Sequence, residues 1–189
     1  PYEYMHSDIS VIDGRQVNVI SFEPQKHVRE LSYTGQLFID VDNFALVEAR
    51  FEIDPKYVNG VTKQFVERKS KGIEVTLQQA KYVVSYRPSD NSIYYMNHIR
   101  VDLRFKVKNK KRLFGGSSDL HIWIDMVNCK TDIDDVESFS RKERLSSNIV
   151  FSEIKHVHDP NFWDKFNIIL PEDKLRELIL NSLSEIAEE

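Results

Sequence analysis

The sequence contains little of what marks several protein classes. It has one cysteine, Cys129, in 189 residues, so it forms no internal disulfide and no metal site of several cysteines. No apolar run approaches the roughly 20 residues that a helix needs to span a bilayer, and the apolar core of a signal peptide is absent. The net charge is −4, which argues against a nucleic-acid partner, because proteins that bind nucleic acid are usually basic.

The composition is sufficient for a folded core. Hydrophobic residues make up 41% of the chain and aromatic residues 11%, which is typical of a compact globular protein. The length fits one domain, and no low-complexity linker interrupts it. We therefore expect residues 1–189 to form a single domain. Because the chain begins at Pro1 and not at a methionine, we expect this domain to be a processed or trimmed piece of a longer protein.

Most of the chain shows β-strand patterns. Asp13-Gly14 lies between two apolar runs within residues 10–22, which predicts a tight hairpin. Residues 33–53 repeat this form, with the turn expected at 40–43. A long strand is predicted over residues 73–87, followed by a turn at 88–91, where proline, serine, aspartate and asparagine are turn-forming residues.

The clearest strand covers residues 99–108, where apolar and polar residues alternate strictly. A period of two predicts an antiparallel strand with one face on a core and the other in water. The apolar positions are Ile99, Val101, Leu103, Phe105 and Val107, and the charged positions are Arg100, Asp102, Arg104, Lys106 and Lys108. Residues 119–128 alternate in the same way, with Leu120, Ile122, Ile124 and Met126 on one face.

Helices are predicted in two places. A short helix is expected near residues 61–70. A second helix is expected from Pro171, since proline suits the first helical position; its apolar stripe predicts that it packs on the sheet. Residues 131–147 are expected to form a loop, with a partly helical segment as the alternative, and residues 148–154 a short strand. The predicted fold is therefore α+β, mainly β, with a curved antiparallel sheet of seven to ten strands.

The sequence offers weak candidates for catalysis. His156 and His158 are two positions apart and precede Asp159, so in an extended segment both imidazoles would point to one side. A metal site needs at least one more ligand than this pair supplies, and we predict neither a metal nor another cofactor. The pair leaves open the alternative of a hydrolase that uses His156 or His158.

Two other groups of residues are candidates for binding. Four tyrosines flank one predicted hairpin and are candidates for lining an apolar cavity, although aromatic residues in such positions are more often cross-strand pairs that stabilise a curved sheet. They are Tyr82, Tyr86, Tyr94 and Tyr95. The basic positions Arg100, Arg104, Lys106 and Lys108 are candidates for an interaction surface, or else protect a strand edge by their charge.

Three segments together resemble the C-terminal region of Bacteroidetes cell-envelope proteins that carry a carboxypeptidase-regulatory-like domain. They are VIDGRQVNVISFEP (11–24), YTGQLFIDVDNFALVEARFEI (33–53) and FWDKFNIILPEDKL (162–175). The second segment is also similar to hairpins of LolA-type lipoprotein carriers. This resemblance implies an unclosed barrel whose concave face, covered by helices, can hold acyl chains. It also implies that the chain is the C-terminal part of a longer protein with a periplasmic or outer-membrane-associated location, and it supplies no catalytic residue.

The resemblance and the residues together predict a non-catalytic binding or interaction domain of the cell envelope. The expected partners are a lipid, a lipoprotein or another envelope protein, held on the concave face of the sheet. Phe162, Trp163 and Phe166 precede the predicted C-terminal helix. We expect these three aromatic residues to close one end of the sheet and to form a wall of the cavity.

Overall fold

The structure is a computed structural model, which describes residues 2–66, 69–89, 93–111, 116–128, 131, 136–146 and 154. Contacts divide the chain into two compact units, residues 1–128 and 129–189, and each unit is described by itself. The prediction of a single domain stays a prediction.

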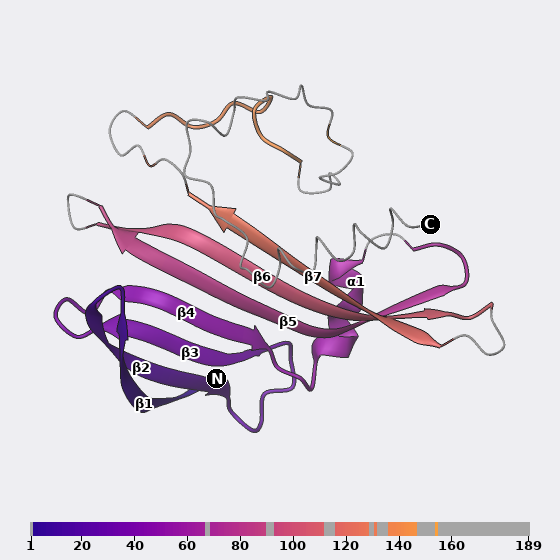
Figure 1. The fold of residues 1–189 in the computed structure, drawn as a ribbon, viewed down its shortest axis with the longest axis horizontal. Coiled ribbons are helices and arrows are strands. Elements are labelled where there is room, and N and C mark those ends of the chain that lie inside the picture. The colour runs from indigo at the N-terminus through magenta and orange to yellow at the C-terminus, as the bar shows by residue number, and fades with distance from the viewer. Residues whose placement is uncertain are drawn as a thin grey trace, which may run out of the picture. The chain divides into compact units, whose positions relative to one another are not determined.

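The first unit is built on one antiparallel sheet of seven strands (Figure 1). Each strand pairs with the next one in the sequence, so the order is β1-β2-β3-β4-β5-β6-β7 and the sheet is not closed. The strands are β1 (Tyr2–Ile12), β2 (Arg15–Pro24), β3 (Tyr33–Asp40), β4 (Leu46–Ile53), β5 (Ile73–Pro88), β6 (Tyr94–Asn109) and β7 (Ser117–Val127). The prediction of a mainly β protein with an antiparallel, unclosed sheet is confirmed.

The turn between β1 and β2 is the one that the sequence predicts. Asp13 and Gly14 have φ values of 49° and 78°, and two successive residues in this left-handed region are typical of the tight hairpin turn that matches the twist of a sheet. Glycine adopts this conformation without strain, and aspartate tolerates it better than most residues. These two residues therefore fix the register of β1 on β2.

The turn between β3 and β4 is organised by Asp40, the last residue of β3. Its Oδ1 accepts hydrogen bonds from the backbone N–H groups of Asp42 at 2.9 Å and Asn43 at 3.3 Å. Arg15 Nε donates to its Oδ2 at 2.5 Å. This turn lies at the predicted position and continues through Phe44, whose φ is 59°.

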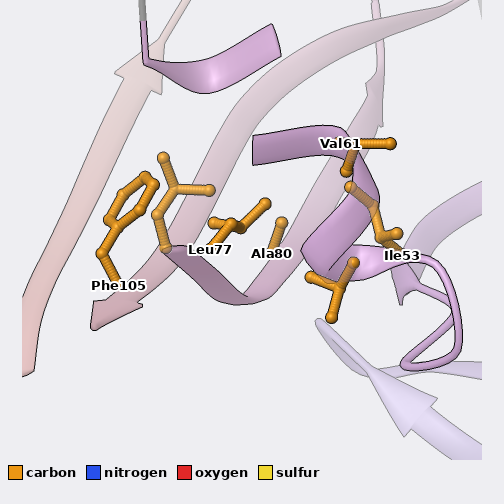
Figure 2. Packing of buried hydrophobic residues seen from close by; sticks show 7 residues of the cluster. Ile53, Val61, Leu77, Ala80 and Phe105 are labelled. Atoms are coloured by element: carbon orange, nitrogen blue, oxygen red, sulfur yellow. The ribbon is translucent and has the colours of Figure 1, made fainter. Parts of the chain in front are cut away.

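The strand pair β5–β6 carries the larger hydrophobic cluster (Figure 2). Leu103 and Phe105 are buried, as the alternation in this strand predicts, and Val101 packs against the cluster. Arg104 and Lys106, which alternate with these apolar residues, are exposed. The full set of buried residues is Ile53, Val58, Val61, Leu77, Ala80, Leu103 and Phe105.

A short helical segment covers this cluster from the connection between β4 and β5. It consists of a 3₁₀ turn, η1 (Val58–Val61), and one α-helical turn, α1 (Thr62–Phe65). The predicted helix near residues 61–70 exists, but its predicted extent was wrong, because Val66 is already extended. Thr62 ties the segment to the sheet, since its Oγ1 accepts a hydrogen bond from the backbone N–H of Leu77 at 3.0 Å.

The edge strand β7 shows the predicted alternation, but its apolar face is open. Leu120 and Ile122 lie opposite Phe105 and Leu103 in the register, so this face continues the apolar face of β6. Their exposed fractions are nevertheless 45% and 38%. Ile124 and Met126 are also exposed.

The described part of the second unit consists of turns and irregular segments. Arg144 Nε donates a hydrogen bond to the carbonyl oxygen of Phe139 at 2.7 Å, and the backbone N–H of Ser140 donates to Glu143 Oε2 at 2.8 Å. This agrees with a loop within residues 131–147. The predicted strand at 148–154, except for Ile154, and the predicted helix from Pro171 lie outside the described residues.

Candidate functional site

The sheet curls toward one of its faces, called here the concave face. Val17 and Val19 in β2 and Phe38 in β3 point to this face and are at most 5% exposed. Their strand neighbours Asn18, Leu37 and Ile39 are only partly buried. Ile12 of the adjacent strand β1 and Tyr94 of β6 pack against this cluster, although β6 is not adjacent to β2, β3 or β4 in the sheet. Because a flat sheet would keep β6 apart from these strands, the contact of Tyr94 requires curvature.

Two contacts between hairpins hold this curvature. Asn43, in the β3–β4 turn, donates a hydrogen bond from Nδ2 to the hydroxyl of Tyr94 at 3.1 Å. Arg87 at the end of β5 lies 3.6 Å from the carboxylate of Asp13 in the β1–β2 turn. Both members of the second pair are largely exposed, so we assign it little energy.

A groove of about 840 Å³ crosses the strands β1 to β5. Three consecutive residues of each strand line it, and Gly35 is the middle residue of the β3 triplet. The lining residues are Glu3, Tyr4 and Met5 of β1, Ser21, Phe22 and Glu23 of β2, Thr34, Gly35 and Gln36 of β3, Arg50, Phe51 and Glu52 of β4, and Lys81, Tyr82 and Val83 of β5.

The alternation of strand side chains places the groove on the concave face. The first and third residues of each triplet share the face of Val19 and Phe38, because side chains two positions apart point the same way. The middle residues pair with one another across the strands and point to the opposite face. The groove therefore has polar side chains together with Met5 and Val83, over a floor of backbone.

Gly35 is required by the close approach of β3 to β4. A Cβ atom built at this position would overlap the carbonyl oxygen of Arg50 and would lie 2.6 Å from Cα of Phe51. Any larger residue would push these strands apart at the middle of the groove floor. A glycine inside a strand often marks such a bend or close backbone approach.

Aromatic clusters on the opposite face flank Gly35 and stiffen this floor. Phe51 stacks on Tyr82 with ring centroids 5.1 Å apart, and Tyr33 meets both rings edge-on. On the other side, Tyr2 packs edge-on against Phe22 at 5.8 Å. Such pairs add packing energy beyond the area that they bury, so they hold the curvature on which the groove depends.

Contacts within the protein fix the orientation of Arg50, a charged residue of the groove lining. Its Nε donates to Glu48 Oε1 at 2.5 Å, and its guanidinium lies 4.6 Å from the ring centroid of Phe38. Glu48 is only 9% exposed, and its second oxygen accepts a hydrogen bond from the hydroxyl of Ser85 at 2.9 Å. The side chain of Arg50 is thereby oriented before any ligand binds.

The concave face also carries two histidine–aspartate pairs between β6 and β7. His98 Nε2 lies 2.8 Å from Asp125 Oδ1, and His121 Nε2 lies 2.7 Å from Asp102 Oδ1. Ser85 lies opposite His98 in the register. Its hydroxyl donates to Glu48, however, so its proton is directed toward a carboxylate and not toward a histidine that could act as a base.

The four tyrosines that we predicted as cavity candidates lie in different places. Tyr82 is among the lining residues, but its ring packs on the cluster of the opposite face, and burial raises the pKa of its hydroxyl. Tyr94 packs on the concave face beside Asn43. Tyr86 and Tyr95 lie near the ends of β5 and β6 and are partly buried. Their role in ligand binding stays a prediction.

Carboxylates lie next to the basic residues of β6. Arg100 lies 3.8 Å from Asp125, and Asp102 interrupts the row. Arg104, Lys106 and Lys108 are exposed. Arg100 lies opposite Val83 of the groove in the register, whereas the three other basic residues lie opposite β5 residues outside the groove. Their role as an interaction surface also stays a prediction.

The remaining sequence candidates cannot be placed. His156, His158, Phe162, Trp163 and Phe166 lie outside the described residues. Within the described residues, no group of three or more histidine, cysteine, aspartate or glutamate side chains could hold a metal ion.

Sequence reasoning missed the groove itself. Its lining comes from five strands, and each strand contributes residues of ordinary polarity. The one local signal was Gly35 in the middle of a strand, a position where glycine weakens a strand unless close packing requires it.

The described part of the chain contains no helix of sufficient length and apolar character to cross a membrane. Comparisons with family models, with curated proteins and with solved structures gave no match.

Proposed function

We propose that this protein is a non-catalytic binding domain of the cell envelope. The groove on the concave face holds an elongated ligand, which is a lipid, a lipoprotein or a segment of another envelope protein. The observation that carries this proposal is the groove of about 840 Å³, a volume within the range of ligand sites. The resemblance to envelope proteins and lipoprotein carriers supports the location in the periplasm or at the outer membrane.

The chemistry of the concave face supports binding over catalysis. Ser85, which lies opposite His98 in the register, donates its proton to Glu48. The histidines His98 and His121 are each held by an aspartate. Between residues 2 and 128, no described serine or threonine is hydrogen-bonded to a described histidine, as activation of a nucleophile requires.

The proposal includes the helix that the sequence predicts from Pro171. In lipoprotein carriers, as the resemblance implies, helices cover the concave side of the sheet. We propose that this helix packs on the sheet of the present protein. Its five apolar positions are Leu175, Leu178, Ile179, Leu183 and Ile186.

Filling the groove tests the binding function. Ser21 lies in the groove between Met5 and Gln36 in the register, so S21W places an indole where the ligand would lie. The matched control is S118W, at an exposed position of β7. The probes are a fluorescent fatty acyl chain and labelled six-residue peptides, with ester, peptide and glycoside reporters to measure turnover.

The expected result is binding of at least one probe, weakened about tenfold or more in S21W and unchanged in S118W, without turnover of any reporter. Circular dichroism confirms that both variants fold. If no probe binds the wild-type protein, or if a reporter is turned over, the proposed function is wrong.

A further inference from the structure

One end of the groove is acidic and the other carries two cationic groups beside one glutamate, and this deepens the proposed function by defining a ligand. At the β1–β2 end, Glu3 and Glu23 are directly opposite each other in the register. Both are exposed, and within the described residues neither has a cation within ion-pair distance. Like charges directly opposite each other destabilise a strand pair, and a cationic group bound between them would relieve this repulsion.

At the β4–β5 end the groove presents two cationic groups, Arg50 and Lys81, together with the carboxylate of Glu52. Lys81 is exposed and lies opposite Glu52 in the register, but Glu52 Oε2 accepts its hydrogen bond from Gln79, at 3.0 Å. Among the groups that the structure describes, no carboxylate is within ion-pair distance of Lys81. Arg50 uses Nε for Glu48, which leaves the two terminal nitrogens of its guanidinium as donors.

The middle of the groove offers a side chain that matches a peptide group. The amide of Gln36 makes no hydrogen bond in the described part of the chain, whereas the hydroxyls of Ser21 and Thr34 donate to Ser7 Oγ and to the carbonyl oxygen of Phe22. A glutamine amide donates and accepts hydrogen bonds, as a backbone peptide group does. A peptide satisfies this amide, and an acyl chain leaves it without a partner.

The dimensions set the length of the ligand. Neighbouring strands lie about 4.8 Å apart, so the four steps from β1 to β5 span about 19 Å, and an extended peptide covers this distance with about six residues. We propose that the groove binds an extended peptide segment of about six residues, with basic residues over Glu3 and Glu23 and acidic residues over Lys81 and Arg50.

The test uses labelled peptides and fluorescence anisotropy. The main probe has two lysines, a serine-glycine spacer and two aspartates. A peptide of six lysines, a peptide of six aspartates and a four-residue peptide with one lysine and one aspartate at its ends are the comparisons. The variants are K81E and the double variant E3Q/E23Q. Their controls are K106E, on the same face but outside the groove, and E30Q, exposed in the β2–β3 connection.

The mixed six-residue peptide is expected to bind more tightly than the three others. Each groove variant weakens this binding roughly three- to fivefold, as expected for an ion pair in contact with solvent, and the controls leave it unchanged. Raising the salt concentration also weakens it, because salt screens exposed charges.

Other outcomes separate this inference from the function on which it rests. If the uniform peptides bind as well as the mixed one, or if the groove variants bind like their controls, the inference is wrong. If the fatty acyl probe binds in the groove and no peptide displaces it, the inference is wrong while the binding function stands. If no probe binds, both are wrong.

Discussion

Asp40 accepts a hydrogen bond from Arg15 Nε at 2.5 Å while its own side chain is 1% exposed. The two residues are 25 positions apart, at the start of β2 and the end of β3. The carboxylate also holds two backbone N–H groups of the β3–β4 turn. One carboxylate therefore fixes a hairpin turn and joins it to the neighbouring strand.

This arrangement predicts a dependence of stability on pH. The hydrogen bond from Arg15 lowers the pKa of Asp40 below its ordinary value of 3.8, and the backbone N–H groups of Asp42 and Asn43 lower it further. A lowered pKa contributes stability above the pKa of the unfolded chain, and this is lost as the pH falls through the folded-state pKa. We expect the melting temperature to fall below about pH 4 for this reason.

The D40N variant isolates this contribution. It is expected to melt at a lower temperature than the wild-type protein at pH 7, and the difference should shrink as the pH falls below 3.8. The D42N variant, which changes an exposed carboxylate of the same turn, serves as control. A D40N melting curve that stays parallel to wild type down to about pH 2 would contradict the assignment.

A second prediction compares two leucines on the same side of the sheet. Leu77 is fully buried in the cluster of Figure 2, and Leu120 on the edge strand is 45% exposed. L77A is expected to cost about 2–5 kcal/mol of unfolding free energy, because it leaves a cavity. L120A should cost less than about 1 kcal/mol. Urea titrations that give equal losses would mean that Leu120 is covered in solution.

The sheet was the most predictable part of the molecule. The strict alternation over residues 99–108 predicted the strand and its buried face. In the structure Leu103 and Phe105 of this face are in the core. The dipeptide Asp13-Gly14 predicted the first hairpin. In the structure both residues adopt the left-handed conformation that its turn needs. These features depend on residues that are near one another in the sequence.

The groove could not be predicted in this way, because its residues meet only through the register of five strands. Glu3 and Lys81 line the same groove, and nothing in their local sequence links them. The concave face was also expected to be apolar. The curvature instead places Gln36 and Arg50 on that face and turns Tyr82 toward the opposite one.

A third prediction concerns the glycine at the floor of the groove. G35A is expected to destabilise the protein by roughly 1–3 kcal/mol, the usual cost of overpacking, since the added methyl group would overlap the backbone of β4. Gly60 in η1 is the matched control, because nothing lies within 4 Å of a Cβ built there. G60A should be neutral or slightly stabilising. Equal melting temperatures for the two variants would show that β3 and β4 have room to separate.

The fourth prediction tests the helix that the sequence places at the C-terminus. Leu178 and Ile179 belong to its apolar stripe, and Glu177 lies on the opposite side of the predicted helix. If the helix packs on the sheet with this stripe buried, L178A and I179A should each cost roughly 2–5 kcal/mol. E177Q should change the unfolding free energy by less than about 0.5 kcal/mol. Urea titrations of the three variants measure these values, and small, equal effects in all three would show that the stripe is not buried against the rest of the protein.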